Sequence, residues 1–235
     1  MTSRGPGRPP GRSDKGRDRE ALLYETALRL FAENGYEETT LRQIARTASV
    51  SPGLMYRYFD GKQALVLRLY TELSTTYAAR IGTAPQSWSV GVVGALQESL
   101  DVLAPHRPLL QSLMGVLVSS RSGGLFSDDT RAARLRVMGA FERVVLCATD
   151  APGEGLRLPL ARLCYLGHLG VILFWLLDRS AHQSATARLV GGIEKHLGRT
   201  RWLLRLPGSQ RALGALDEVV WAGLLGRSLE SVHRL

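Results

Sequence analysis

The chain has 235 residues, 45% of them hydrophobic and 22% charged, which is enough to bury a core in one or two globular domains. Its net charge is +9, carried almost wholly by arginine, and this favours an anionic partner such as nucleic acid. The most apolar run covers only residues 169–177, and the N-terminus lacks a secretory signal, so we expect no membrane span and a cytoplasmic protein.

Residues 1–17 are rich in Gly, Pro and Arg and have little to bury, so we expect a disordered basic arm. Its Gly7-Arg8-Pro9 segment resembles the core of an AT-hook, in which Arg enters a narrow minor groove. The alternative is a solubilising tail that contacts phosphates loosely, and the sequence leaves both open.

Residues 18–65 contain start and stop signals for three short helices. Apolar spacing predicts a helix over 18–34, ended by Gly35 as the C′ residue. Thr40 and Gln43 form a capping box that predicts a second helix over about 41–48. This second helix is expected to pack on the first through its own apolar stripe.

A third helix is expected directly after a three-residue turn. Ser51 is a suitable N-cap, Pro52 suits the first helical position, and the helix should end near Tyr58. Two short helices joined by such a turn are typical of a helix-turn-helix, whose second helix enters the DNA major groove. The helix should turn Met55 inward and leave six residues outside: Pro52, Gly53, Leu54, Tyr56, Arg57 and Tyr58.

The whole segment resembles the N-terminal domain of the TetR/AcrR family of bacterial transcription regulators. The matching motifs are LFAENGY, TTLRQIA and VSPGLMYRYF, followed by Lys62. That family usually has Gly where this chain has Ser49, and the position favours a left-handed backbone. We therefore expect a slightly altered turn rather than a lost motif.

The resemblance implies an all-α protein: a three-helix DNA-binding domain at 18–65 and a helical effector-binding and dimerisation domain at 66–235. It also implies a repressor that binds a palindromic operator in double-stranded DNA as a homodimer and is released by a ligand. We expect phosphate contacts from Thr40, Tyr58 and Lys62, and base contacts from the outer face of the third helix. The full set of expected DNA-binding residues is Thr40, Arg42, Gln43, Pro52, Gly53, Leu54, Tyr56, Arg57, Tyr58 and Lys62.

The rest of the chain shows helical periodicity and no strand alternation. The expected helices cover about 61–81, 87–104, 107–119, 128–149, 159–179, 184–206 and 209–232. Pro159 is expected at a first helical position. Cys147 and Cys164 lie in apolar helical stretches without CxxC spacing, which predicts buried reduced thiols, with a redox pair as the alternative.

The expected helix 159–179 is apolar nearly all round, so every side of it must be covered. A second subunit is the simplest cover, through a four-helix contact with the expected helix 184–206 of each chain. The alternative is that the C-terminal helix 209–232 covers this surface within one chain.

The resemblance further implies a ligand pocket inside the C-terminal bundle. Apolar side chains with two polar groups among them predict its lining and favour a small apolar or aromatic effector. The candidate residues are Met114, Leu117, Met138, Phe141, Tyr165, His168, Ile172 and Trp175. Ordinary core packing is the alternative interpretation of each.

No motif for a catalytic nucleophile, a phosphate-cradling glycine loop or a metal site occurs, so we expect no enzyme, no cofactor and no metal. Two other functions stay open. A low-specificity architectural protein would bind random DNA as well as a palindrome. A helical enzyme or ligand carrier with a vestigial motif would not retain DNA at physiological salt.

Overall fold

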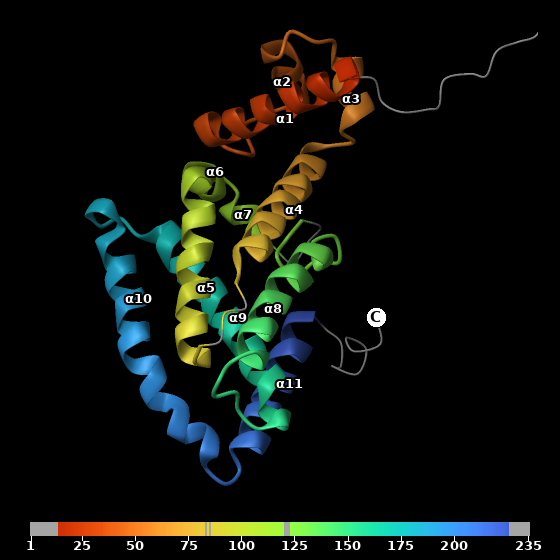
Figure 1. Cartoon of the computed structure of the whole chain (residues 1–235). Coiled ribbons are helices and arrows are strands. Elements are labelled where there is room, and N and C mark those ends of the chain that lie inside the picture. Colours follow the sequence, from red (N-terminus) through yellow and green to blue (C-terminus); the bar gives the residue numbers. More distant parts are fainter. Residues whose placement is uncertain (1–13, 83, 85, 120–122, 226–235) are drawn as a thin grey trace, which may run out of the picture. The chain divides into compact units, whose positions relative to one another are not determined.

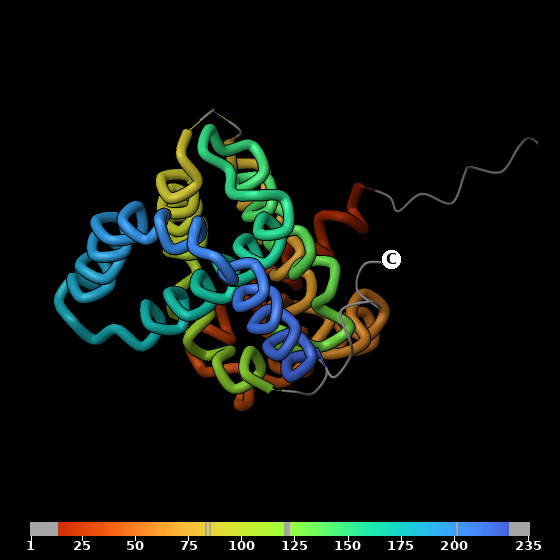
Figure 2. The backbone as a smooth tube through the Cα atoms, turned by 90° about the horizontal axis from the view of Figure 1, so that it is seen from below, coloured from red at the N-terminus to blue at the C-terminus, as the bar shows by residue number. Residues whose placement is uncertain are grey.

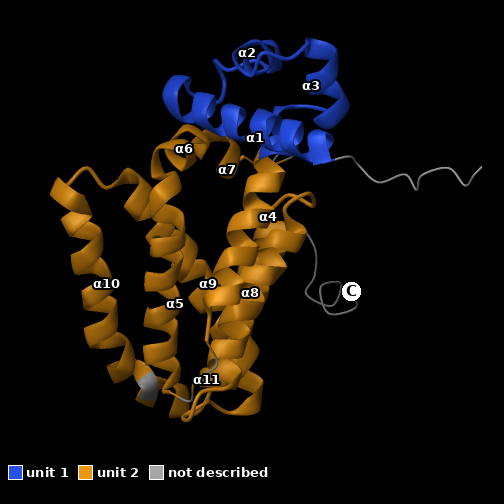
Figure 3. Ribbon diagram, turned by 45° about the horizontal axis from the view of Figure 1, so that its top comes forward, with its two compact units in different colours: residues 1–65 blue, residues 66–235 orange. Residues whose placement is uncertain are grey.

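The computed structural model describes residues 14–82, 84, 86–119 and 123–225. These residues form helices joined by turns, with no strand among them (Figure 1). The chain divides into two compact units, Met1–Leu65 and Val66–Leu235, which Figure 3 colours separately. The prediction of an all-α fold is confirmed.

The first unit contains α1 (Asp14–Asn34), α2 (Leu41–Thr47), α3 (Pro52–Tyr58) and the start of α4 (Lys62–Arg80). Its core forms where the apolar stripes of these helices meet. The buried side chains include Leu23, Ala27, Leu30, Phe31, Ile44, Ala45, Met55 and Phe59. The spacing of apolar residues predicted these stripes, so the local pattern and the packing agree.

Helix α1 begins at Asp14, one turn earlier than predicted, so the arm expected over residues 1–17 is wrong in its last part. The Asp14 carboxylate lies in the first helical turn and pairs with the Arg17 guanidinium, which favours a helix without burying apolar surface. A hydrophobic pattern cannot detect such a turn. The Gly7-Arg8-Pro9 segment lies outside the described residues.

The turn between α2 and α3 is a Schellman motif built around Ser49. The Ser49 N–H donates to the Arg46 carbonyl at 3.1 Å, and the Val50 N–H donates to the Ala45 carbonyl at 2.9 Å. Ser49 itself has φ of +54°, in the left-handed region. The helix-turn-helix is therefore retained, and Ser takes the conformation that Gly adopts more easily.

Ser49→Gly should raise the free energy of unfolding by about 1 kcal/mol. A left-handed backbone costs a residue with a Cβ roughly 1–2 kcal/mol, and glycine relieves this strain. Part of the stabilisation is lost because glycine raises the conformational entropy of the unfolded chain. Chemical denaturation of the two proteins measures the difference. Ser49→Ala is the matched control and should bring no gain, since it keeps the Cβ. Equal stabilisation by Ala would mean that the Ser hydroxyl, and not the backbone, carries the cost.

The second unit contains the rest of α4 and a bundle of further helices. These are α5 (Trp88–Leu103), α6 (Arg107–Ser112), α7 (Met114–Leu117), α8 (Arg131–Leu146), α9 (Glu154–Leu177), α10 (Ser184–Leu197), the 3-10 helix η3 (Gly198–Arg205) and α11 (Ser209–Leu225). Helix α9 packs against α5, α6, α8, α10 and α11, and Figure 2 shows it crossing the middle of the unit. Helix α10 lies at the edge, against α5 (Figures 1 and 2).

Helix α9 begins at Glu154, so the prediction that Pro159 starts it is wrong. Pro159 lies in the second turn, where it removes one backbone hydrogen bond. The earlier start is supported by the Arg157 guanidinium, which donates to the Pro152 carbonyl at 3.0 Å, and by burial of Leu156. The tertiary contacts of this first turn outweigh the local signal from proline.

By length and composition alone α9 could cross a membrane, and it is the one such helix in the described part of the chain. It contains Arg162, whose Nη1 lies 3.0 Å from the Asp217 carboxylate of α11, with both side chains buried. A buried ion pair and helices packed along its length identify α9 as the central helix of the bundle.

Helix α11 covers one side of α9. Besides the ion pair, the Trp221 ring stacks on the Tyr165 ring with centroids 6.2 Å apart. Another side of α9 stays uncovered: Phe174 is 41% exposed and Leu177 61%. The C-terminal helix therefore covers only part of this apolar surface within one chain.

The two cysteines differ in their surroundings. Cys147 is exposed at the C-cap of α8, so the prediction that it is buried is wrong. Cys164 lies within α9, and burial raises the pKa of its thiol to about 12. Both are free thiols.

Candidate nucleic-acid interface and ligand cavity

Helix α3 presents one face to the core and the other to solvent. Met55 is fully buried, whereas Tyr56 is 51% exposed and Arg57, Pro52 and Gly53 are exposed. The seven residues of the helix span about 10 Å, and a DNA major groove is about 12 Å wide. The outer face therefore offers a guanidinium and a phenol, both of which can bond to base edges or phosphates, on a helix that fits the groove.

Leu54 and Tyr58 complete this outer face, and both are half-buried. The Ser51 hydroxyl accepts a hydrogen bond from the Leu54 N–H at 3.3 Å and so caps the helix as predicted. Of the seven residues of α3 only Met55 is buried, so every predicted member of the α3 surface is at least partly exposed, and the cap fixes where that helix begins.

Helix α2 adds polar and basic groups. The Thr40 N–H donates to Gln43 Oε1 at 2.7 Å, and the Gln43 N–H donates to the Thr40 hydroxyl at 3.2 Å, which closes the predicted capping box. Arg42 is exposed one residue before Gln43. Arg46, four residues after Arg42, is exposed as well, but it was not among the expected DNA-binding residues. The i,i+4 spacing of the two arginines could have indicated that both lie on one face of α2.

Lys62 lies at the start of α4 and has a role that the sequence did not predict. Its ammonium donates to the Tyr36 carbonyl at 2.6 Å and to the Glu37 carbonyl at 3.1 Å, and lies 4.4 Å from the centre of the Tyr36 ring. Lys62 therefore holds the turn that follows α1. An ammonium has three donors, so one N–H beyond these two bonds can serve a phosphate.

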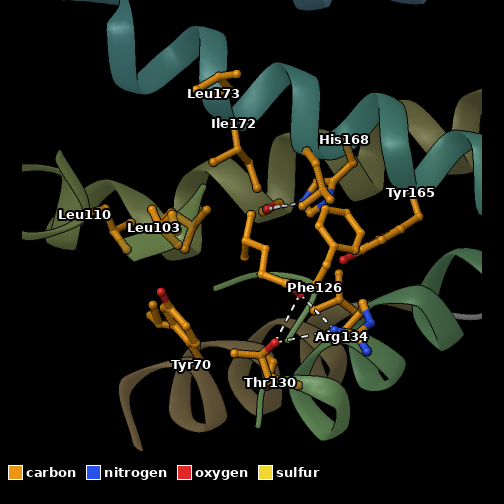
Figure 4. Close-up of a pocket in the computed structure, with 18 of the residues that line it drawn as sticks. Tyr70, Leu103, Leu110, Phe126, Thr130, Arg134, Tyr165, His168, Ile172 and Leu173 are labelled. Atoms are coloured by element: carbon orange, nitrogen blue, oxygen red, sulfur yellow. Dashed lines mark hydrogen bonds between the residues drawn. The ribbon is translucent and has the colours of Figure 1, made fainter. Parts of the chain in front are cut away.

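The second unit encloses a cavity of about 520 Å³, a size typical of sites for small ligands. Figure 4 shows its walls: Tyr70 from α4, Leu103 from α5, Leu110 from α6, and Tyr165, His168, Ile172 and Leu173 from α9. Met114 of α7 and Val137 of α8 also line it. The lining is overwhelmingly apolar.

The polar groups of the cavity do not all lie together: in Figure 4 the Tyr70 hydroxyl lies on the side of Leu103 and Leu110, away from His168 and Arg134. Ser99 Oγ and His168 Nε2 share a hydrogen bond of 2.7 Å. Arg134 Nη1 donates to the Leu125 carbonyl at 2.9 Å and to the Ser127 carbonyl at 3.1 Å. No other residue in the wall carries a permanent charge among those that the structure describes.

A family model for bacterial regulatory proteins of the tetR family matches residues 23–69, from α1 through α3 into α4. Residues 23–69 are therefore identified as a TetR-family domain.

Relatives of the chain support this assignment of the domain. The uncharacterized HTH-type transcriptional regulator YuxN of Bacillus subtilis is 43% identical over 53 residues, a match that covers 23% of this chain and 18% of YuxN. The HTH-type transcriptional repressor Rv1474c of Mycobacterium tuberculosis is 29% identical over 182 residues, covering 75% of this chain and 89% of the relative.

A crystal structure of a tetR-family transcriptional regulator from Streptomyces coelicolor shares the fold. It matches with a TM-score of 0.55 at 21% identity, over 86% of this chain and 90% of that one. The fold of the helical bundle, as well as that of the helix-turn-helix, is therefore similar to the fold of this regulator.

Five of the eight predicted pocket residues lie in the cavity wall: Met114, Leu117, Tyr165, His168 and Ile172. The other three do not line this cavity. Phe141 is fully buried and packs against the His168 ring at 5.1 Å, behind the wall, and Met138 belongs to the same core cluster. Trp175 is turned toward the Arg107 guanidinium, 5.5 Å from its ring.

The prediction missed the wall contributed by α4 and α5 and by the start of α8. Tyr70 and Tyr77 lie on the buried face of α4, a helix for which no cavity residue was predicted. Arg134 lies among other arginines in RAARLR, a pattern typical of a solvated helix face. Only the path of the loop before α8 turns Arg134 inward, so no local signal could have indicated it.

His168 is an uncharged histidine in this site. Burial, against Tyr77 and Phe141, lowers its pKa from the ordinary 6.5 to about 3. The native state therefore binds no proton at His168 down to about pH 3, whereas the unfolded chain takes one up below pH 6.5.

The free energy of unfolding should consequently fall by about 2 kcal/mol between neutral pH and pH 5, since each pH unit below the unfolded pKa costs about 1.4 kcal/mol. Chemical denaturation from pH 8 to pH 5 measures the slope. His168→Gln should flatten it, while His196→Gln, on the exposed surface of α10, should leave it unchanged. A His168→Gln variant with the full wild-type slope would contradict the assignment.

Proposed function

We propose that this chain is a sequence-specific transcriptional repressor that binds a palindromic DNA operator as a homodimer and is released by a small apolar or aromatic ligand. The observation that carries this proposal is the outward face of α3, where Tyr56 and Arg57 stand exposed beside a fully buried Met55. An exposed aromatic and an arginine on so short a helix suit contact with a duplex better than contact with water. We place the protein in the cytoplasm, where its DNA would be.

The proposed contacts divide into two kinds. Thr40, Tyr58 and the remaining donor of Lys62 would hold phosphates and fix the register of the protein on DNA. Arg57 can donate two bonds to a guanine, and Leu54 can contact a thymine methyl. Arg42, Gln43, Pro52, Gly53 and Tyr56 would complete the surface on the groove and its rim.

Dimerisation is supported by the uncovered side of α9. Its residues follow a spacing of four and three, the repeat of a helix seam: Leu163, Gly167, Gly170, Phe174 and Leu177. A Cβ at Gly167 would meet no atom within 4 Å, so a second helix can approach closely there. A two-fold operator requires two copies of α3, which such a seam would provide.

Ligand release is supported by the composition of the cavity wall, to which α4 contributes Tyr70, Leu73, Ser74 and Tyr77. A ligand lowers DNA affinity only if it binds the DNA-incompetent state more tightly, and a tenfold effect requires about 1.4 kcal/mol of differential binding. No catalysis is proposed. The Ser99–His168 pair lacks an effective base at neutral pH, because His168 has a pKa of about 3.

Selection of bound fragments from random DNA tests the proposal as a whole. We expect recovery of one site with two-fold symmetry. Recovery of unrelated sequences would instead indicate a low-specificity architectural protein, and no retained DNA at physiological salt would contradict DNA binding.

Arg57→Ala should cost about 1–3 kcal/mol of operator affinity and relax the preference at one base position, because a bidentate contact to guanine would be lost. Titration of the selected site and its single-base variants measures both effects. Arg29→Ala is the matched control, since Arg29 is a comparably exposed arginine on α1. An equal loss on every sequence would show that Arg57 holds only phosphate.

A further inference from the structure

We propose that the ligand of the cavity carries a single carboxylate, and that Arg134 binds it while an apolar tail occupies the opposite end. This inference deepens the proposed function and rests on the cavity being the effector site. It concerns one feature that an apolar effector leaves unexplained: a cation in an otherwise apolar wall.

Arg134 is a buried cation that lacks an anion. It is 7% exposed, and its Nη1 donates hydrogen bonds to neutral oxygens: the carbonyls of Leu125 and Ser127 and the hydroxyl of Thr130. The described residues give it no ion pair. Carbonyls solvate a guanidinium, but they do not neutralise its charge.

The surroundings of Arg134 do not remove that charge. Desolvation lowers its pKa from the usual 12.5, yet an arginine stays protonated in a protein. Asp128 and Tyr165 act weakly in the opposite direction, and Asp128 is an exposed residue that does not line the cavity. A cation with so little compensation gives the cavity a positive potential, which favours an anionic ligand.

The other end of the cavity holds no charged residue among those that the structure describes, and its polar group in Figure 4 is the uncharged Tyr70 hydroxyl. Figure 4 places Leu103 and Leu110 on the side away from Arg134, and Ile172 and Leu173 along the α9 wall. Phe126 and Tyr165 lie beside Arg134, so the charged group of the wall lies at one end, whereas Leu103 and Leu110 lie at the other with the uncharged Tyr70. A carboxylate at Arg134 with a hydrocarbon tail toward Leu103 matches both ends.

Isothermal titration of the full chain with hexanoate, octanoate, decanoate and dodecanoate, each against the alcohol of equal length, tests the inference. At least one acid should bind about tenfold or more tightly than its alcohol, the effect expected of a charge-assisted hydrogen bond in an apolar site. Equal affinity of acid and alcohol would overturn the carboxylate assignment and leave the cavity as an effector site. Absence of binding by both would overturn the assignment together with this part of the proposed function.

Two variants locate the contact. Arg134→Met should abolish the preference for acid over alcohol, while Arg143→Met, which removes the same charge from the exposed end of α8, should keep it. Leu103→Trp should weaken acid and alcohol alike by filling the tail end. Because Arg134 also orders the loop before α8, Arg134→Lys is tested in parallel: it keeps the charge and should keep a preference for the acid. A preference that survives Arg134→Met would overturn the inference.

Discussion

Phe174→Glu should convert the protein to a monomer and lower its affinity for the operator by about 100-fold or more. Burying one phenylalanine contributes about 1.5–3 kcal/mol, and two-fold symmetry places the substitution in the interface twice. The glutamate adds the cost of a charge without a partner in an apolar seam. Since 1.4 kcal/mol corresponds to a factor of ten, a loss above two decades follows.

Sedimentation at micromolar concentration and titration of the selected operator measure the two effects. Leu146→Glu is the matched control: Leu146 is 45% exposed, close to the 41% of Phe174, but lies on α8 outside the seam. The control should remain dimeric and bind DNA as the wild type does. A Phe174→Glu variant that still sediments as a dimer would place the interface elsewhere.

Asp217→Ala should lower the free energy of unfolding by about 3–5 kcal/mol, because it removes the Asp217 carboxylate from the buried Arg162 guanidinium. Both side chains are under a tenth exposed, so water cannot compensate. The same substitution loosens the attachment of α11, which is otherwise held by the stacking of Trp221 on Tyr165.

The double variant Arg162→Met with Asp217→Leu distinguishes the destabilisation caused by removing one partner from the net stabilisation that the ion pair provides. It should be far more stable than either single variant, because replacing a buried ion pair by apolar side chains is often neutral. Chemical denaturation at one fixed protein concentration measures the cycle, since stability of a dimer depends on concentration. Additive losses would show that the two residues stabilise the bundle independently.

The helix-turn-helix could be predicted from sequence because its signals are local. A capping box at Thr40 and Gln43, a Ser51 cap followed by proline, and the Gly35 C′ residue each fix a helix end within a few residues. The predicted starts at Leu41 and Pro52 accordingly agree with the structure.

The cavity could be predicted only in part, because its wall depends on how distant segments meet. Tyr165, His168 and Ile172 share one face of α9, and helical spacing alone groups them. Arg134 instead points inward because Leu125 and Ser127, which precede α8, offer it their carbonyls. The hydrogen-bond partner of His168 could not be predicted from local sequence either, since Ser99 is 69 residues away in the chain.

Helix α4 runs without interruption from Lys62, which holds the turn after α1, to Tyr77 and beyond, in the wall of the cavity. These two residues lie about 22 Å apart along the helix axis at 1.5 Å per residue. If the Tyr77 end is the pivot, a tilt of about 5° displaces the Lys62 end by about 2 Å, more than a hydrogen bond tolerates. A rigid helix of this length can thus convert a sub-ångström adjustment around a ligand into a larger movement of Lys62. The turn after α1 must then move with Lys62 or lose its hydrogen bonds to it, without any helix unfolding.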